Sequence, residues 1–516
     1  MGTTADKLNR LINTKEGIRQ EINRAYGAEE IGTSDTFNSY IQKLEEHPFY
    51  VKTLVEGTIE SVNLPNTTSI GKCAFYNCIL AKVSIPNAIS IGDNAFGSCY
   101  GLAEVSFPNA TSIGSSAFNS CRNLRSVAIP NATDIGNRAF YYCTYLRSVD
   151  FPNATSVGDS AFDRCTELQS ASFPNATSIG DSVFSDCTHL HSINIPNVAS
   201  VGSHAFDGCT NLNSVDFPKA ISVGSYAFLN CNYLSRVYIS NATSVGSYAF
   251  DSCTYLQSVD ISNATSIGSY AFRGCTRLQS ITIPKATSIE SNTFDGCTNL
   301  QSVTIPNATS IGDNVFSGCT NLTSVSLPKS ERGIVAGMFS KSTKLTTLVI
   351  SAVKSIPKRF FLGYSALKNL DISGATSIAL PTATSSVTSA SVSSDGAFHG
   401  CSSLTSLNLP GITTLAGATV KPTLWGSAID YSAFRGSSLA SISLPNITSI
   451  GAYAFCDCST LTTLYIGTNI STVCTLENTN AIPSSVTTIY VPASLVDSYK
   501  SATNWSSYAD KIQATP

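Results

Sequence analysis

The sequence predicts a repeat solenoid in which each coil of about 22 residues contributes parallel β strands and a short helical turn. Three observations predict it: cysteine returns every 22 residues, a phenylalanine keeps a fixed distance from it, and strand-like and turn-like residues keep fixed places between them. A small α-helical module is expected before the first coil. One coil of this length cannot bury its own apolar face, so stability must come from stacking on neighbours.

The cysteine period is the strongest of these signals. Steps of 22 residues join Cys99, Cys121, Cys143, Cys165, Cys187, Cys209, Cys231, Cys253, Cys275, Cys297 and Cys319. We expect an inward-facing core ladder of cysteines and phenylalanines, exemplified by Cys121, Cys143, Cys165, Phe118, Phe140 and Phe162. Cysteines one coil apart would have Cα atoms about 5 Å apart, but their Cβ vectors would run parallel, so free thiols that pack as small apolar residues are predicted.

Each coil also carries strand and turn signals in a fixed order. Val303 and Ile305 alternate as a short strand, and Pro306 ends it because proline has no N–H to donate. A second extended piece, 309–311, follows. The coil therefore contributes two short strands.

The corner after the second strand is glycine in most coils, for example Gly312. A conserved spacing of glycine predicts a positive φ there, and Glu290 at the same place predicts local strain. The following segment, 313–319, has room for one or two helical turns.

The repeat L-x-S-V-x-I-P-N-A-T-S-I-G-x-x-A-F-x-x-C resembles the BspA-type leucine-rich repeat, which occurs in bacterial surface proteins, some protists and gut-associated phages. The resemblance covers about residues 58–492 and implies a leucine-rich-repeat-like solenoid. Repeat scaffolds host many partners, so it implies a binding or structural protein without naming the partner.

We expect three parts: a helical hairpin over 1–50, the solenoid over 51–492, and a C-terminal cap with an aromatic-rich helical closure over 493–516. The segment LNRLINTKEGIRQEINRAYGAEEIGTSDTFNSYIQKLEE resembles N-terminal helical modules of tail-associated proteins of gut phages and prophages. It is either an attachment module or a cap that covers the first coil.

Composition excludes several classes of function. Charged residues are 13%, and Lys+Arg 31 against Asp+Glu 34 leaves no basic block, which argues against nucleic acid as a partner. No apolar run of about 18 residues predicts a membrane span. The start MGTTADKLNRLINTKEG lacks the apolar core of a secretory signal, so export by the Sec pathway is not expected.

No Ser-His-Asp, phosphate-loop or paired-carboxylate pattern stands out, so no enzyme and no cofactor are predicted. Cys187, His189, His191 and His204 come nearest to a metal set, but they lack tetrahedral ligand spacing, and no metal site is expected. The Asn-Ala-Thr repeats, such as the one at Asn109, are interpreted as turn residues and not as glycosylation sites.

Two insertions, at about 379–396 and 416–432, are the main functional lead. From Ile378 to Phe398 is 20 residues and from Leu415 to Phe434 is 19, where an ordinary coil needs 5. Insertions at one coil position should emerge side by side on one face, although they could also be a tolerated decoration. The candidate receptor-binding loop residues are Thr384, Ser389, Lys421, Trp425, Asp430 and Tyr431.

The exposed strand positions carry mostly short hydroxyl side chains, such as Ser148, Ser170 and Ser192. These fit a close-packed sheet surface. A glycan-binding surface is the alternative, although such surfaces usually add aromatic platforms.

The sequence favours a non-enzymatic virion component of a phage or prophage, a tail-fibre or baseplate protein for host attachment. Its N-terminal helices would contact other virion proteins, and its loops would recognise a bacterial surface protein or glycan. The alternative is a bacterial cell-surface adhesin of the BspA type, and an intracellular repeat scaffold is a third class. Monomer, dimer and trimer all remain open.

Overall fold

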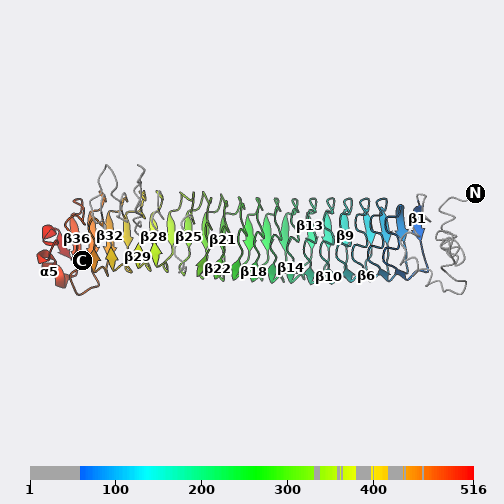
Figure 1. Cartoon of the computed structure of the whole chain (residues 1–516), viewed down its shortest axis with the longest axis horizontal. Coiled ribbons are helices and arrows are strands. Elements are labelled where there is room, and N and C mark those ends of the chain that lie inside the picture. The colour runs from blue at the N-terminus through cyan, green and yellow to red at the C-terminus, as the bar shows by residue number, and fades with distance from the viewer. Residues whose placement is uncertain are drawn as a thin grey trace, which may run out of the picture. The chain divides into compact units, whose positions relative to one another are not determined.

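The computed structural model describes residues 59–329, 338–356, 361, 364–378, 397–398, 400–415, 434, 437–455 and 458–516. They belong to two compact units, Met1–Ile261 and Ser262–Pro516. In each unit the described coils place one strand in a first sheet and a two-residue strand in a second sheet, and successive strands pair in parallel (Figure 1). The predicted parallel repeat solenoid is confirmed.

The strands of the first unit follow chain order. Its first series of strands, which forms three successive sheets, contains β1 (Ile59–Asn63), β3 (Leu80–Ser84), β5 (Glu104–Ser106), β7 (Ser126–Ala128), β9 (Ser148–Asp150), β11 (Ser170–Ser172), β13 (Ser192–Asn194), β15 (Ser214–Asp216), β17 (Arg236–Tyr238) and β19 (Ser258–Asp260). Its second sheet contains β2 (Ser69–Ile70), β4 (Ser90–Ile91), β6 (Ser112–Ile113), β8 (Asp134–Ile135), β10 (Ser156–Val157), β12 (Ser178–Ile179), β14 (Ser200–Val201), β16 (Ser222–Val223) and β18 (Ser244–Val245).

The second unit repeats this arrangement. Its first series is β21 (Ser280–Thr282), β23 (Ser302–Thr304), β25 (Ser324–Ser326), β26 (Thr347–Val349), β28 (Asn369–Asp371), β30 (Ser406–Asn408), β32 (Ser441–Leu444), β34 (Thr463–Ile466), β36 (Thr488–Val491) and β37 (Ile512–Ala514). Its second series is β20 (Ser266–Ile267), β22 (Ser288–Ile289), β24 (Ser310–Ile311), β27 (Ser355–Ile356), β29 (Ser377–Ile378), β31 (Thr414–Leu415), β33 (Ser449–Ile450) and β35 (Thr475–Leu476).

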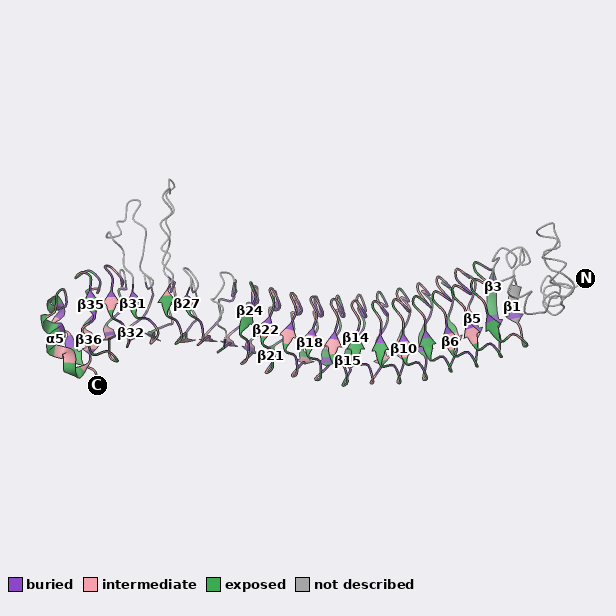
Figure 2. Cartoon of the chain, turned by 60° about the horizontal axis from the view of Figure 1, so that its bottom comes forward, coloured by how far each residue is buried: buried purple, intermediate pink, exposed green. Residues whose placement is uncertain are grey.

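The core is a set of ladders of like side chains, because strands pair at equivalent repeat positions. Phe118, Phe140 and Phe162 are all 0% exposed, and their ring centroids are 5.1 and 5.2 Å apart in successive coils. Figure 2 colours the chain by burial, and β9, for example, has a buried central residue between two exposed ones. Each coil thus covers the apolar face of its neighbour, as the repeat length requires.

The ladder cysteines are hydrogen-bond donors as well as apolar fillers. Cys121, Cys143 and Cys165 are free and 0% exposed. The Cys143 thiol donates to the carbonyl of Phe118 at 3.1 Å, and Ser342 at the same coil position makes the same bond to Phe316 at 3.1 Å. Serine therefore replaces cysteine there without losing the contact.

The thiol ladder makes stability dependent on pH. Burial raises the pKa of Cys143 well above its ordinary value of 9.0, so the folded chain keeps a proton that the unfolded chain releases. The contribution of the buried, protonated thiol to stability is fully present below pH 9, the ordinary pKa of cysteine, and is lost as the pH rises above it. From pH 7 to pH 10 the free energy of unfolding should fall in both proteins. The fall should be smaller in Cys143→Ser than in wild type by about 1.4 kcal/mol, as measured by urea denaturation. Parallel pH curves for the two proteins would contradict this.

The corner glycines do not have the positive φ that the sequence predicts. At Gly136 the reason for glycine is a close approach between coils: a Cβ there would lie 2.6 Å from the carbonyl carbon of Gly114 and 2.7 Å from the backbone nitrogen of Ser115. Glycine is required because two backbones meet, and a side chain would separate them.

Positive φ values occur instead on two turn residues in most coils. Arg138 has φ 56° and Tyr142 has φ 61°. The segment between the corner and the cysteine forms successive turns, and the predicted helical turn is wrong there. Left-handed residues interrupt a right-handed helix. The freed N–H groups bond across coils, as Phe118 N–H does to the carbonyl of Ala139 at 2.7 Å.

Glu290 replaces the corner glycine in one coil and keeps the backbone bond to the preceding coil. The Glu290 N–H donates to the carbonyl of Ile267 at 3.0 Å, against 2.7 to 2.9 Å for the corner glycines that make the same bond. The Thr293 hydroxyl, fully buried, donates to the carbonyl of Glu290 at 2.6 Å. Glu290 is not among the residues with positive φ, so the local strain that the sequence predicts from a left-handed corner is not found there.

The C-terminal end closes the second unit with less helix than the sequence predicts. It contains the short helices η1 (Ala493–Leu495), α5 (Val496–Ser501) and η2 (Ser506–Tyr508), and then β37, which pairs with β36. Trp505 is 1% exposed and its indole N–H donates to the carbonyl of Cys474 at 2.6 Å. Within the described residues no helix is long and apolar enough to cross a membrane.

Two further expectations fall outside the described residues. The helical hairpin over 1–50 and the insertions at about 379–396 and 416–432 belong to segments whose structure is not described. The described chain offers no support for the helical hairpin, which stays a prediction.

Candidate ligand-binding groove

The first sheet is interrupted in each unit, while the core ladder continues beneath it. Within the first unit β7 does not pair with β9, nor β13 with β15, and within the second unit β28 does not pair with β30. The central residue beside each interruption, Val127, Ile193 or Leu370, is half-buried, whereas most central strand residues are buried. An interruption therefore leaves an aliphatic side chain within reach of the surface.

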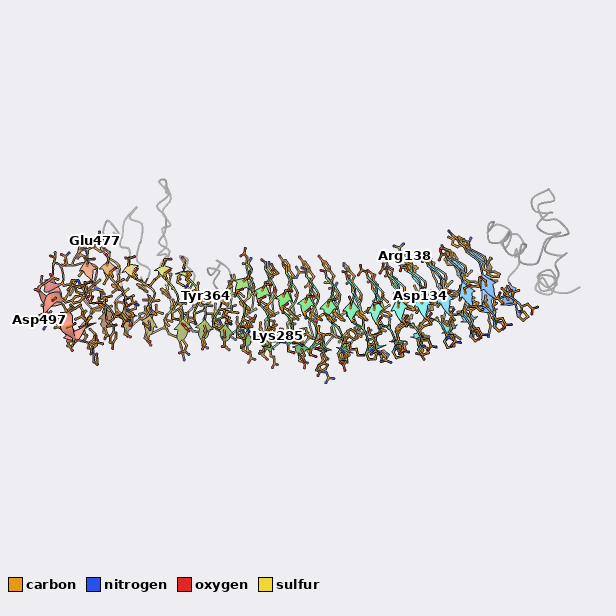
Figure 3. All side chains as sticks on the ribbon, turned by 90° about the horizontal axis from the view of Figure 1, so that it is seen from below. Asp134, Arg138, Lys285, Tyr364, Glu477 and Asp497 are labelled. Carbon is orange, nitrogen blue, oxygen red and sulfur yellow. The ribbon has the colours of Figure 1, made fainter. Side chains whose placement is uncertain are left out.

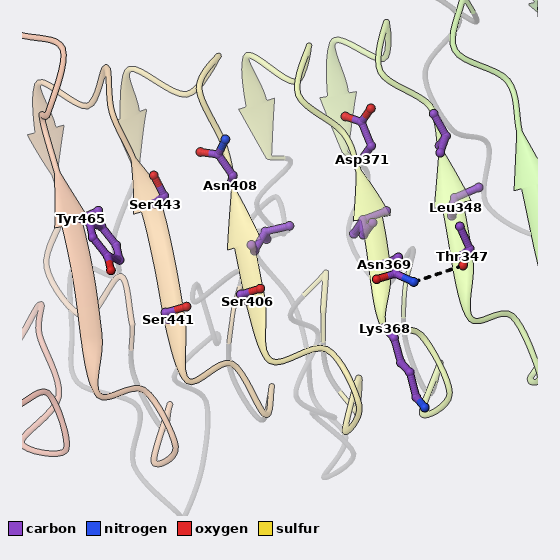
Figure 4. A pocket seen from close by; sticks show the side chains of 13 residues that line it. Thr347, Leu348, Lys368, Asn369, Asp371, Ser406, Asn408, Ser441, Ser443 and Tyr465 are labelled. Carbon is purple, nitrogen blue, oxygen red and sulfur yellow. Dashed lines mark hydrogen bonds between the residues drawn. The ribbon is translucent and has the colours of Figure 1, made fainter. Parts of the chain in front are cut away.

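A groove of about 420 Å³ crosses the interruption between β28 and β30 (Figure 4). Its floor contains Leu348, Leu370 and Leu407. The coils beneath the groove remain stacked, as the ring centroids of Phe361 and Phe398 show by lying 5.1 Å apart. The full lining is Thr347, Leu348, Val349, Lys368, Asn369, Leu370, Asp371, Ser406, Leu407, Asn408, Ser441, Ser443 and Tyr465.

Amide, carboxylate and hydroxyl groups stand around this floor. Asn369 is exposed, and its amide nitrogen donates to the hydroxyl of Thr347 at 3.3 Å, a bond that does not use its carbonyl oxygen. Asn408 is exposed on the neighbouring strand β30. These groups come from the outward-facing positions of adjacent strands, because alternate side chains of a strand point to opposite faces.

Asp371 adds a negative charge to the groove. Burial by itself raises the pKa of this carboxyl group, but hydrogen bonds from Ser351 at 2.6 Å and from the N–H of Ser373 at 3.0 Å outweigh it and hold the pKa below its ordinary value. The carboxylate is thus ionised at neutral pH and acts as an acceptor.

Tyr465 on β34 supplies an aromatic surface at the end of the groove. Its ring stacks on Tyr490 of β36 with centroids 4.9 Å apart. Figure 4 shows Tyr465 beside Ser443, so its other side borders the groove. This is the aromatic platform that the repetitive serine rows by themselves lack.

The lining contains no histidine or cysteine, and Asp371 is its only carboxylate, so it offers no pair for nucleophilic or acid–base catalysis. Among the described residues no group of three or more potential ligands could hold a metal ion. In the set considered from the sequence, Cys187 donates to the carbonyl of Phe162 at 3.1 Å, and His204 lies 3.0 Å from the carboxylate of Asp207.

The side chains of the sequon asparagines form hydrogen bonds within the fold. The side-chain amide of Asn109 donates to the carbonyl of Pro86 in the preceding coil at 2.8 Å, and Asn131 does the same to Pro108 at 2.7 Å. Asn175 repeats the contact with Pro152. These residues bridge coils as well as making turns.

The groove is not the site that the sequence singled out. The six predicted loop residues lie outside the described structure, whereas the strands before the insertions, β29 and β31, and those after them, β30 and β32, are described. The groove residues do not stand out in the sequence, because serine rows dominate the exposed strands. The sequence does carry one signal for the groove: Asn369, Asn408 and Tyr465 interrupt rows of mostly short side chains.

A match to a protein-family model shows the family of the chain. The BspA type leucine rich repeat region, a model of six copies, matches residues 31–147, 111–234, 177–300, 287–383 and 427–508. The chain belongs to this family. The resemblance seen in the repeat is confirmed, and the comparisons indicate no catalytic family and give no support to phage-tail-like termini.

Solved structures similar to this BspA-type chain include two bacterial proteins. A leucine-rich repeat protein from Bacteroides ovatus is 26% identical, with 57% of this chain and 83% of that chain covered and a TM-score of 0.40. A leucine rich cell surface protein from Faecalibacterium prausnitzii is 25% identical, with 55% and 91% covered and a TM-score of 0.36. A search of curated proteins gave no match.

Proposed function

We propose that this BspA-type protein is a non-enzymatic adhesion protein of a bacterial cell surface and that its groove binds a neutral saccharide. The observation that carries the proposal is the groove itself, with an aromatic ring, amides and an ionised carboxylate around a leucine floor. Family membership supports the surface location, because BspA-type repeats occur in bacterial surface proteins.

The groove suits a sugar because a pyranose has two kinds of surface. Its C–H face stacks on an aromatic ring, and its hydroxyl groups pair with amide and carboxylate groups. Tyr465 offers the first contact, and Asn369, Asn408 and Asp371 offer the second. A ligand site of mostly apolar surface with a few placed polar groups is the usual arrangement for small molecules.

The virion assignment is not favoured. It depends on helices within residues 1–50 and on the insertions, which lie outside the described residues, and no comparison supports it. Antibodies against the protein should label intact bacterial cells that express it. Recovery of the protein only in phage particles would contradict the surface location and restore the virion assignment.

Removing the aromatic platform should weaken saccharide binding. We expect Tyr465→Ala to lower the affinity for a neutral oligosaccharide selected on a glycan array by at least about tenfold, corresponding to about 1.4 kcal/mol, as measured by isothermal titration calorimetry. Asn369→Ala should lower it by a similar factor, because it removes a hydrogen-bonding group.

Tyr238 provides a matched control for this experiment. It is 45% exposed and occupies the same strand row as Tyr465, but on β17 in the other unit. Tyr238→Ala should leave the affinity unchanged within twofold. An equal loss in Tyr238→Ala, no loss in Tyr465→Ala, or no binding to any neutral saccharide would contradict the proposed site.

A further inference from the structure

A second group of surface residues, in the first unit, has a different chemistry. Tyr100, Arg122, Tyr142, Tyr141 and Arg138 form a chain of ring contacts across successive coils, which we call the arginine–tyrosine cluster. The guanidinium carbon of Arg122 lies 4.8 Å from the ring centroid of Tyr142 and 5.6 Å from that of Tyr100. Tyr141 and Tyr142 are 6.1 Å apart.

The two tyrosines fix the orientation of Arg122. A guanidinium that contacts aromatic rings keeps its N–H edges free, because its donors lie in its plane. Arg122 and Arg138 are both exposed. A donor fork that is already oriented loses less conformational freedom when it binds a planar oxyanion.

Arg122 is not neutralised by an acidic side chain of the described residues. The described residues include the ion pairs Lys82–Glu104 at 2.6 Å and Arg164–Asp186 at 3.6 Å, but Arg122 and Arg138 take part in none. The carboxylate of Asp163 in the next coil interacts electrostatically with Arg138, whereas Asp134, the nearest carboxylate in the sequence, accepts a hydrogen bond from Ser156 at 2.6 Å. Figure 3 shows Arg138 at the edge of the body, apart from Asp134.

We propose that the arginine–tyrosine cluster is a binding site for an acidic saccharide whose carboxylate pairs with Arg122 and whose ring lies over the exposed tyrosine surface of Tyr100. A carboxylate matches the planar fork of one guanidinium. Tyr100 is 50% exposed and offers apolar surface to a sugar ring. This site is separate from the groove of the second unit, and neither proposal depends on the other.

A saccharide is favoured over a nucleic acid because the cluster carries few charges. Only two arginines are available in it, and the whole chain has a formal net charge of -3. Nucleic acid binding draws on many phosphate contacts along a basic surface. A ligand with one carboxylate per recognised sugar needs only a single oriented guanidinium.

The test uses the whole chain and three probes in calorimetry: tetragalacturonic acid, its methyl ester, and sialyllactose. We expect at least one carboxylate probe to bind and the methyl ester to bind at least tenfold more weakly than the acid. Arg122→Gln should lower the affinity for the acid at least tenfold. Arg122→Lys should recover only part of it, because lysine keeps the charge and loses the planar fork.

Arg164→Gln is the matched control, because Arg164 is an exposed arginine about two coils from Arg122 that is already paired with Asp186. It should change the affinity by less than twofold, and thermal unfolding of each variant should match wild type. Galacturonate binding alone points to a uronate ligand, and sialyllactose binding alone points to a sialate. Equal binding of acid and ester, no binding of either acid, equal losses in Arg122→Gln and Arg164→Gln, or preferential binding of single-stranded DNA would each overturn the proposal.

Discussion

Gly136→Ala is expected to lower the free energy of unfolding by about 3 kcal/mol or more, at the upper end of overpacking effects. The new Cβ would lie 2.6 Å from the carbonyl carbon of Gly114 and 2.8 Å from the carbonyl oxygen of Ile113. Both are backbone atoms of the adjacent coil, so no side chain can rotate away. The loss should appear in urea denaturation, even though alanine by itself would stiffen the unfolded chain and add stability.

Gly208→Ala separates this steric effect from backbone strain. Gly208 has φ +73°, and the nearest atom to a new Cβ is a carboxylate oxygen of Asp186, which can move. Residues at this turn position in other coils, Arg164 and Asn230, have φ 60° and 57°. The cost should therefore be about 1 kcal/mol. If Gly208→Ala proved as damaging as Gly136→Ala, close approach would not be the reason for the corner glycine.

Phe140→Ala should lower the free energy of unfolding by about 3 to 5 kcal/mol. Phe140 is 0% exposed and lies in the aromatic stack, 5.1 Å from Phe118 and 5.2 Å from Phe162 by ring centroids, and 6.0 Å from Phe151. Its loss leaves a cavity that opens onto both neighbouring coils. Because stability is a sum over neighbours, hydrogen exchange should speed up first in the coils on either side.

Two comparisons sharpen that experiment. Phe140→Leu keeps most of the apolar volume and should cost clearly less than alanine. Tyr145→Ala removes a ring that is 51% exposed and should change stability by no more than about 0.5 kcal/mol. A uniform rise in hydrogen exchange over the whole unit would show that the coils unfold together and do not respond locally.

The candidate groove illustrates what sequence reasoning could not reach. Alternation along the sequence predicts the exposed strand rows but does not predict their interruptions. Ser126–Ala128 and Ser170–Ser172 are chemically similar, yet β7 does not pair with β9, whereas β11 does. A ladder bond depends on small differences in coil spacing that every neighbouring coil influences, and no local pattern encodes them.

The repeat by itself determined the coil length, the parallel stacking and the identity of the core ladders, because a 22-residue coil has no other way to bury Phe140 and Cys143. Only the tertiary structure decided why the corner needs glycine, which turn residues take positive φ, and where the first sheet opens between β28 and β30. Those features arise between coils, from the distance between two backbones. A periodic sequence specifies that coils touch, and the stack specifies how closely.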